Sequence, residues 1–418
     1  MDNQTLKKQQ GRNPLGFWRN RRIVVGVCGG IAAYKTLDLI RRLRDAGATI
    51  SAVVATHSAL EFVTPLTLGA LAEAPVHTEL MSLTQEREMG HIRLAREADL
   101  VVVAPITAHT LARLANGLAD DLLTAMLLAR RGPTLLAPAM NAGMWENPAT
   151  QRNVAQVVAD GYLLAGPTSG ALACGESGVG RMAEPLDILE AARRALSDKP
   201  LAGRRILITA GPTREAVDPV RYVSNHSSGR MGFAIAQAAL RLGAEAELVH
   251  GPVSLPPVLG AQMTAVTCAE KMQAACLALW PRCDAAVMTA AVADFRPESA
   301  PTSKIKKQPG QERMTLELTR NPDILAAVCA ARRPGQVVMG FAAETDDLLA
   351  NAQAKLARKG CDLLAANDVS DTRIGFGSER NRITLLAPGA EPQAWPEMDK
   401  ETLAEKLLLA LAQRWDAA

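Results

Sequence analysis

The sequence predicts an α/β protein built from two doubly wound, Rossmann-like parallel-sheet domains. Apolar runs rich in β-branched residues alternate with amphipathic helical stretches, which is typical of parallel strands covered by helices on both faces. The same strand–helix–strand plan begins twice along the chain. With 418 residues, the chain is also too long for a single hydrophobic core.

The first half contains four clear strand patterns and a helix. The strands are predicted at residues 23–30, 49–55, 100–105 and 134–140, and residues 37–47 form an amphipathic helix that ends at a glycine. Unusual loops follow these strands. Because ligands of doubly wound sheets collect at the carboxyl ends of the strands, we expect the functional residues in these loops.

A charged stretch at residues 197–205 predicts a linker, after which the plan starts again. We therefore expect a basic, disordered tail (1–20), a first domain (21–197) and a second domain (198–418). In the second domain, strands are predicted at residues 204–211, 246–251, 284–294, 313–319, 336–344 and 361–368, and helices at 229–243 and 399–415.

The composition excludes several classes of function. A formal net charge of +3 and 3% aromatic residues give no basis for nucleic-acid binding. No apolar run approaches the ~20 residues that a membrane span needs, and the polar N-terminal segment lacks the apolar core of a signal peptide. Seven cysteines without a C-x-x-C pair indicate a reducing, cytoplasmic location and no structural zinc.

Two common nucleotide-binding motifs are disfavoured. Residues 29–36 nearly spell a P-loop, but Tyr34 replaces the glycine that precedes the lysine. Neither first strand is followed by G-x-G-x-x-G, and the second strands end without an acidic residue that could hold an adenosine ribose. Phosphate binding by Gly29–Ala32 at a glycine-opened helix N-terminus stays open.

Three polar residues stand at predicted strand ends or helix starts in the first half. His91 lies just ahead of a helix, Asn141 follows a strand, and Cys174 lies in a glycine-rich loop after a strand at residues 162–165. Each alone has an ordinary explanation: a capping or surface histidine, an asparagine N-cap, and a structural thiol. Their combination favours a catalytic site.

The segments GGIAAYK, MGHI, APITA, PAMN and ACGESGVGRM resemble the homo-oligomeric flavin-containing cysteine decarboxylase family, in particular its phosphopantothenoylcysteine decarboxylases, which in bacteria are fused to a phosphopantothenate–cysteine ligase. The resemblance runs from Arg21 to the C-terminus. It implies FMN as cofactor, His91 as the base in thiol oxidation, Asn141 as the ligand of the substrate carboxylate, and Cys174 as the proton donor to the enethiolate.

The resemblance also implies a set of FMN contacts and a homo-oligomer, because such sites in the family lie between subunits. The residues implied to contact FMN are Gly29, Gly30, Ile31, Ala32, Thr56, Ser58, Pro105, Ile106, Thr107, Ala108, Thr110 and Met140. The APITAHT loop departs from the commoner APATA pattern at Ile106 and His109.

The second half begins with a long loop between its first strand and the following helix. Ser227, Ser228 and Gly229 bring hydroxyl and N–H groups to a helix N-terminus, which suits a phosphate. Lys304 begins a K-x-K-K run in a Pro/Ser/Gly-rich segment. Such a run is ordinarily a solvated loop, but its cations would neutralise a triphosphate in a nucleotide-dependent ligase.

The segments SNHSSG, AAVADF, KIKK, NPDI, GFAAET and AANDVS resemble the phosphopantothenate–cysteine ligases. The resemblance implies that CTP activates 4′-phosphopantothenate as an acyl-cytidylate, which L-cysteine then attacks. It implies that Asn225 supports the first step and Lys304 the second, with Mg²⁺ held by residues that the sequence does not identify. The implied CTP contacts are Met288, Thr289, Ala290, Asp294, Lys304, Asn321, Pro322, Asp323, Ile324, Phe341, Lys355 and Lys359.

The sequence therefore favours a bifunctional enzyme that makes 4′-phosphopantetheine. The alternatives are a protein with one active half, a flavin-binding regulatory or scaffold protein without catalysis, and an NAD-linked oxidoreductase. The third lacks its motif. The first two are disfavoured because all five implied catalytic positions are present: Cys174, His91, Asn141, Asn225 and Lys304.

Overall fold

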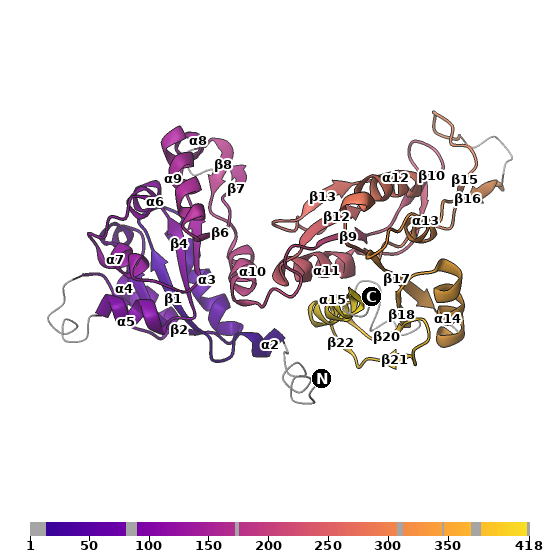
Figure 1. Ribbon diagram of the computed structural model, residues 1–418. Coiled ribbons are helices and arrows are strands. Elements are labelled where there is room, and N and C mark those ends of the chain that lie inside the picture. The colour runs from indigo at the N-terminus through magenta and orange to yellow at the C-terminus, as the bar shows by residue number, and fades with distance from the viewer. Residues whose placement is uncertain are drawn as a thin grey trace. The chain divides into compact units, whose positions relative to one another are not determined.

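A computed structural model of the chain describes residues 14–80, 90–171, 175–306, 312–344, 347–368 and 378–415. For residues 14, 15, 90, 91, 344 and 368, it describes the backbone alone. The chain divides into two compact units, Met1–Ser197 and Asp198–Ala418 (Figure 1).

The first unit contains a six-stranded sheet in the order β3-β2-β1-β4-β5-β6, with every neighbouring pair parallel. The strand order reverses between β1 and β4, which is the switch point where such sheets bind ligands. The strands are β1 (Arg22–Val27), β2 (Thr49–Ala55), β3 (Val76–His77), β4 (Leu100–Ile106), β5 (Thr134–Pro138) and β6 (Leu163–Leu164).

Helices cover both faces of this sheet because its strands are apolar on both sides (Figure 1). In β1, Ile23, Val25 and Val27 enter one core and Val24 enters the other. The first core is covered by α3 (Ala33–Asp45), α4 (Pro65–Ala72) and α10 (Pro185–Leu196), and the second by α5 (Gly90–Glu97), α6 (Ala108–Ala115), α7 (Leu122–Leu128) and α9 (Pro148–Ala159).

Three short elements surround the carboxyl ends of these strands. They are the 3₁₀ helix η1 (His57–Glu61), the helix α8 (Ala142–Glu146), and an antiparallel ribbon of β7 (Thr168–Ala171) and β8 (Ser177–Arg181). Each is a connection between a strand and the next helix, so each can carry ligand-binding groups without disturbing the sheet.

The expected disordered tail over residues 1–20 is wrong for its last part. Pro14–Phe17 forms the short helix α2, and Trp18 is buried in the first core. Phe17 packs edge-on against Trp18, and the guanidinium groups of Arg21 and Arg193 lie over the Phe17 ring. The aromatic pair therefore ties this segment to the unit. Residues 1–13 lie outside the described ranges.

The second unit contains an eight-stranded sheet in the order β13-β12-β9-β14-β17-β18-β20-β21. The first six strands are parallel, and β20 and β21 are antiparallel additions at one edge. The strands are β9 (Arg205–Ala210), β12 (Glu245–His250), β13 (Gln262–Ala265), β14 (Ala285–Met288), β17 (Val337–Glu344), β18 (Leu363–Asp368), β20 (Ile383–Leu386) and β21 (Gln393–Ala394).

Helices again cover both faces, so the predicted pair of doubly wound α/β domains is confirmed (Figure 1). One face carries α11 (Arg230–Arg241) and α15 (Lys400–Trp415). The other carries α12 (Ala269–Leu279), α13 (Ile324–Ala330) and α14 (Leu348–Lys359), with the 3₁₀ turn η3 (Trp280–Arg282) after α12.

Two antiparallel ribbons project from this unit, and a third short pair lies near α15. They are β10–β11 (Arg214–Ala216 and Tyr222–Ser224), β15–β16 (Phe295–Pro297 and Leu318–Arg320) and β19–β22 (Arg380–Asn381 and Met398–Asp399).

The predicted sheet strand at residues 313–319 is wrong: only its end pairs, and it does so in the β15–β16 ribbon. Its alternating apolar residues, Met314, Leu316 and Leu318, remain exposed because no sheet lies beneath them. Nowhere in the described ranges is a helix both long and apolar enough to cross a membrane.

Candidate active sites

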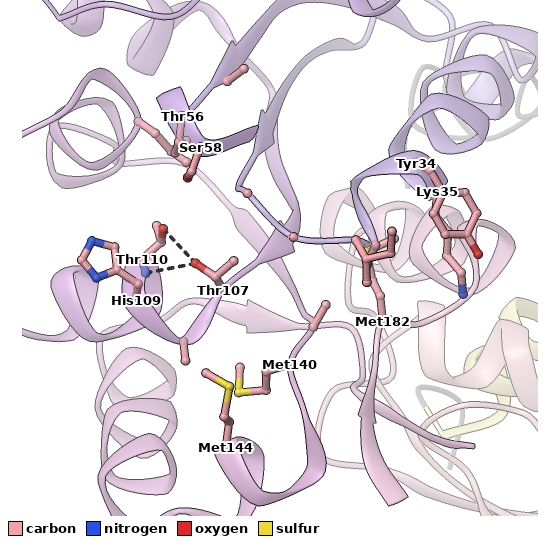
Figure 2. A pocket seen from close by; sticks show the side chains of 18 of the residues that line it. Tyr34, Lys35, Thr56, Ser58, Thr107, His109, Thr110, Met140, Met144 and Met182 are labelled. Carbon is pink, nitrogen blue, oxygen red and sulfur yellow. Dashed lines mark hydrogen bonds between the residues drawn. The ribbon is translucent and has the colours of Figure 1, made fainter. Parts of the chain in front are cut away.

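A cavity of about 890 Å³ opens at the carboxyl ends of the strands in the first unit. Figure 2 shows Thr56 and Ser58, the turn that carries Thr107 and Thr110, and Met140 arranged around it. Each comes from a segment that directly follows a strand, as predicted. The expected FMN contacts that line the cavity are Gly29, Gly30, Ile31, Ala32, Thr56, Ser58, Thr107, Ala108, Thr110 and Met140.

Pro105 and Ile106 are not among the residues that line the cavity, and their predicted contact with FMN stays a prediction. Strand β4 continues through Ile106, which is fully buried in the second core. The Pro105 carbonyl accepts a hydrogen bond from Cys28 N, and the Ile106 carbonyl accepts one from Ala139 N. The chain therefore reaches the cavity only at Thr107.

The glycine loop after β1 is shaped by the absence of side chains. A Cβ added at Gly29 would lie 2.5–2.6 Å from side-chain and backbone atoms of Ser58, whereas the nearest atom to a Cβ at Gly30 is Thr107 Cγ2 at 3.9 Å. Helix α3 follows, and its N-cap Ala32 has no side-chain oxygen to cap the helix. The open N-terminus of this 13-residue helix suits an anion.

A second helix N-terminus, that of α6, also lies at the cavity. Thr107 is its N-cap, and Thr107 Oγ1 accepts a hydrogen bond from Thr110 N at 3.3 Å (Figure 2). This turn presents two hydroxyl groups to the cavity, together with His109, which the sequence analysis did not include among the contacts. The polar lining is thus concentrated in short, helix-capping turns.

Asn141 also lines the cavity and caps helix α8. Its Oδ1 accepts a hydrogen bond from Gly143 N at 2.8 Å, and its Nδ2 donates to Glu176 Oε2 at 2.7 Å. The amide group therefore faces a carboxylate that the sequence analysis did not single out. The one sequence feature that points to Glu176 is its place directly after Cys174 and Gly175 in the glycine-rich loop.

The two remaining predicted residues of this half are only partly described. His91 is the second residue of helix α5, rather than a residue ahead of it, and its side chain lies outside the description. Cys174 lies outside the described residues. Their predicted roles stay predictions.

A cluster of three charged side chains at the cavity was missed. Glu184 Oε1 accepts hydrogen bonds from Lys35 Nζ at 2.9 Å and from Arg181 Nη2 at 2.7 Å, and both cations line the cavity. Lys35 belongs to the helix after the glycine loop, and Arg181 ends β8. Lys35 and Glu184 are 149 residues apart in sequence, so no local pattern could predict this pair.

A second missed cluster joins α6 to the start of α7. Arg113 donates to Asp121 Oδ2 at 2.8 Å and is also paired with Asp120, while Asp121 caps α7 through Thr124 N. Burial alone would raise the pKa of Asp121, but hydrogen bonds from Thr124 and from Arg113 outweigh it and lower that pKa. Asp121 therefore stays ionised and holds Arg113 at the cavity wall.

The predicted residues of the second unit gather around the loop after β14. Asn225 Nδ2 donates to the Val292 carbonyl at 3.0 Å. On the other side, Asn321 Nδ2 donates to the Ala293 carbonyl at 2.8 Å, and its backbone N–H donates to the Asp294 carbonyl. Three segments that are distant in sequence are thus joined by amide hydrogen bonds.

The end of β14 lies against β9 and the start of α11. Thr289 Oγ1 donates to the Thr209 carbonyl at 2.5 Å, and Ala290 N donates to Thr209 Oγ1 at 3.2 Å. A Cβ added at Gly232, in the first turn of α11, would lie 2.7 Å from Thr289 Oγ1. The N-cap of α11 is Gly229, which has the left-handed backbone conformation and no side chain to cap the helix. The N-terminus of α11 is therefore open to an anion.

The other implied CTP contacts lie along β14, β17, α13 and α14. Met288 pairs with Gly340, next to Phe341. Lys359 forms an ion pair with Asp323, and burial of its ammonium lowers its pKa, partly offset by the nearby charge of Asp294. Within this group, Pro322 precedes Asp323, Ile324 is buried at the start of α13, and Lys355 lies one turn before Lys359 in α14.

Lys304 is exposed, but the backbone beside it is anchored. Ile305 N donates to Asp218 Oδ2, and Arg221 Nη2 donates to the Ile305 carbonyl, both at 3.2 Å. Asp218 and Arg221 belong to the turn that joins β10 to β11, the ribbon that leads to Asn225. No group of three His, Cys, Asp or Glu side chains in the described part of the chain is placed to hold a metal ion.

Comparison with known proteins divides the chain at the same region. Residues 15–197 match the family model "Flavoprotein", and residues 201–414 match "DNA/pantothenate metabolism flavoprotein C-terminal domain". The coenzyme A biosynthesis bifunctional protein CoaBC of Vibrio cholerae is 45% identical over 388 residues, which cover 93% of this chain and 97% of that protein. The chain belongs to the CoaBC family.

Two further CoaBC proteins are similar over nearly the whole chain. That of Escherichia coli is 45% identical over 398 residues (95% of this chain, 98% of that protein), and that of Bacillus subtilis 43% over 397 residues (94% and 97%). CoaBC membership confirms the resemblance inferred from the motifs. Both units are covered, so the cavity lies in the flavoprotein half of a CoaBC protein.

Solved structures match the two halves of this CoaBC chain separately. The C-terminal domain of a CoaBC protein is 35% identical, covers 53% of this chain and 100% of its own, and has a TM-score of 0.45. A PPC decarboxylase mutant complexed with pantothenoylaminoethenethiol is 35% identical, covers 42% of this chain and 97% of its own, and has a TM-score of 0.39.

Proposed function

We propose that this chain makes 4′-phosphopantetheine by two reactions of coenzyme A biosynthesis. The C-terminal unit joins L-cysteine to 4′-phosphopantothenate with CTP, and the N-terminal unit decarboxylates the resulting phosphopantothenoylcysteine with FMN. The observation that supports this most directly is the CoaBC similarity across both units, together with a cavity lined by ten of the twelve implied FMN contacts.

The cavity fits a flavin mononucleotide in size and lining. The volume of about 890 Å³ lies within the range of small-molecule pockets. The loop at Gly29 and Gly30 packs closely against Ser58, and a Cβ at Gly29 would collide with that residue. We assign the phosphate to the open N-terminus of α3, and further contacts to Thr56, Ser58 and the Thr107–Thr110 turn. When bound, FMN would supply the oxidation of the substrate thiol and its later reversal.

The residues of this half have roles set by the substrate chemistry. An α-carboxylate beside an amide nitrogen has no electron sink, but once the thiol is a thioaldehyde the carboxylate lies β to C=S, and CO₂ can leave. Asn141 binds the substrate carboxylate through its Nδ2, His91 accepts the proton during thiol oxidation, and Cys174 donates the proton to the enethiolate. These assignments rest on the motif resemblance and on the position of Asn141 in the cavity wall.

In the ligase half, we assign CTP to the carboxyl ends of β9, β14 and β17. Asn225 supports formation of the acyl-cytidylate, and Lys304 supports its conversion to the amide, as the motif resemblance implies. Asn225 directly follows β11, and the segment that carries Lys304 is tied to Asp218 in the turn between β10 and β11. Mg²⁺ accompanies the triphosphate and lowers its charge repulsion. The open N-terminus of α11 would receive a phosphate group.

We also propose that the chain self-associates through the flavin half. Ile31 and Tyr34 line the cavity but are 61% and 59% exposed, so two apolar side chains stand at its mouth. A second copy of the chain would cover them. Sedimentation of the flavin-loaded protein tests this, and a monomer would contradict it.

One experiment tests the function as a whole. The purified protein should be yellow and should release CO₂ when it receives 4′-phosphopantothenate, cysteine, CTP and Mg²⁺. A colourless protein that still consumes CTP would restrict function to the ligase half. A Cys174→Ser variant should release CO₂ but accumulate the oxidised enethiol product, and a normal yield of 4′-phosphopantetheine would refute its role as proton donor.

A further inference from the structure

The Asn141 amide group has a fixed orientation in the cavity wall. Its Oδ1 accepts the hydrogen bond from Gly143 N that caps α8, so its Nδ2 is the end directed away from that helix. That Nδ2 donates to Glu176 Oε2 at 2.7 Å, a short distance typical of a hydrogen bond to a carboxylate. The group proposed to bind the substrate carboxylate therefore already holds a carboxylate of the protein.

The β7–β8 ribbon brings Glu176 to this position by close backbone packing. Met140 N donates to the Gly180 carbonyl at 2.9 Å. A Cβ at Gly180 would lie 2.3 Å from the Met140 carbonyl oxygen, and one at Gly178 would lie 2.7 Å from Ala142 Cβ. Only glycine permits this approach, and Glu176 immediately precedes the strand that makes it.

We propose that Glu176 occupies the carboxylate-binding position of Asn141 until the substrate carboxylate displaces it. This inference rests on the proposed function of the N-terminal half. Nδ2 carries two N–H groups, but two carboxylates held at one nitrogen would repel each other, so the substrate carboxylate and Glu176 compete at this amide. Glu176 thereby weakens the binding of ligands that carry the carboxylate and leaves ligands without it unaffected.

The arrangement affects the binding of the substrate and the release of the product differently. Phosphopantothenoylcysteine must displace Glu176 to reach Asn141. The product has lost its carboxylate and therefore does not compete with Glu176 for the Asn141 amide. Once CO₂ has gone, Glu176 returns to Asn141 Nδ2, which keeps that donor satisfied while the product leaves.

The test uses two ligands that differ only in the carboxylate. They are the serine analogue of phosphopantothenoylcysteine, which has no thiol to oxidise, and the same analogue without its carboxyl group. Their inhibition constants are measured in decarboxylation by the wild-type protein and by Glu176→Gln and Glu176→Ala variants. A third variant, Glu146→Gln, removes an exposed negative charge from α8 without touching the Asn141–Glu176 bond.

We expect Glu176→Ala to bind the carboxylate analogue about 3- to 10-fold more tightly, as expected for loss of a competing charged hydrogen bond. Glu176→Gln shifts in the same direction by less, because its amide oxygen still accepts from Asn141. The KM for substrate falls while kcat stays within about twofold. The analogue without the carboxyl group binds all variants equally, and Glu146→Gln binds both analogues like the wild type.

Unchanged or weaker binding of the carboxylate analogue to Glu176→Ala and Glu176→Gln would overturn the proposal, as would equal tightening of both analogues. The yellow colour of each variant reports that the flavin site is intact, and Glu176→Gln decides the matter if Glu176→Ala loses its flavin. Absence of decarboxylation by the wild-type protein would instead contradict the proposed function.

Discussion

The two units share a doubly wound sheet, but their candidate sites are built in opposite ways. In the first unit, the site is a cavity of about 890 Å³, and its wall includes Gly29 and Gly180, where an added Cβ would collide with neighbouring atoms. In the second unit, the implied residues are joined to one another: Asn225 to Val292, and Asp323 to Lys359. The flavin cavity is formed before the flavin arrives, although we propose that the Asn141–Glu176 pair in its wall opens for the substrate carboxylate. In the second site, the polar groups that pair with one another must exchange partners for the nucleotide.

This difference matches the two ligands we propose. A flavin that stays bound through many turnovers suits a preformed cavity, because no groups need to be rearranged for it. A nucleotide that enters and leaves in each turnover suits polar groups that pair with one another between turnovers. Substitutions in the two units test this comparison, and they follow in order from the largest expected effect to the smallest.

The largest effect is expected at an exposed cation of the ligase half. Lys304→Gln should lower the rate of amide formation about a hundredfold, because one charge that stabilises the transferring group is lost. Pyrophosphate release measured beside amide formation should show that acyl-cytidylate accumulates. Lys306→Gln, which changes an exposed lysine two residues away, is the control. Unchanged turnover would exclude the role of Lys304.

The preformed character of the cavity is tested at Gly29. A Gly29→Ala variant places its Cβ within 2.6 Å of the Ser58 backbone, so the loop must shift. We expect flavin affinity to fall about tenfold or more, while CTP-dependent ligation is retained. Flavin absorbance per chain gives the readout. Gly69→Ala, whose Cβ would meet only ordinary contacts, should keep its flavin. A fully yellow Gly29→Ala protein would contradict the steric argument.

A smaller effect is expected at the anchor of the lysine segment. Hydrogen bonds from the Arg221 side chain and from backbone N–H groups, including that of Ile305, hold the pKa of Asp218 well below its ordinary value. The ionised Asp218 carboxylate therefore stabilises the folded anchor fully above about pH 4, and this stabilisation is lost as the pH falls further. Asp218→Asn should imitate this loss at neutral pH and speed tryptic cleavage after Lys304 about fivefold.

The matched control for this anchor is Glu298→Gln. It removes a negative charge from an exposed position near the same segment, with only a backbone bond to Glu317 in the described structure. If Glu298→Gln accelerates cleavage as much as Asp218→Asn, charge alone is responsible and the anchor has no special role.

The smallest effect concerns the charged cluster at the cavity. Glu184→Gln weakens the ion pairs to Lys35 and Arg181, and should lower the free energy of unfolding of the flavin half by about 1 kcal/mol or less, because Glu184 is half exposed. Urea unfolding followed by flavin release measures this. Glu73→Gln, which breaks a more exposed pair with Arg44, should cost less. A larger loss for Glu73→Gln would reverse the ranking.

The features that were predicted correctly are local in sequence. The strands could be read from continuous apolar runs, and the glycine loop from residue types that suit a helix start, whereas the Thr107 turn was expected only from the family resemblance. Pro105 and Ile106, which the family resemblance implied as FMN contacts, belong to β4 and are not among the residues that line the cavity. The exposed alternation at residues 313–319 was taken as a sheet strand, because period-two patterns do not reveal whether a sheet lies beneath them.

Two of the features that were missed depend on pairs of distant segments. Asn141 and Glu176 are 35 residues apart, and Lys35 and Glu184 are 149 apart. From the sequence, Glu176 and Glu184 could each be an ordinary surface residue, because the neighbouring residues in the chain do not indicate which side chain it contacts. Such contacts follow from the packing of ribbons and helices around the sheet, which no window of sequence contains.

The sequence by itself determined two doubly wound sheets and the strand ends that carry the sites, because hydrophobic periodicity and backbone-specific residues act over a few positions. Its family resemblance implied ten of the residues that line the cavity. Only the tertiary structure decided which side chains meet there. It placed the Glu176 carboxylate on the Asn141 amide and anchored the Lys304 segment to Asp218, since hydrogen bonds and charges depend on distances in space.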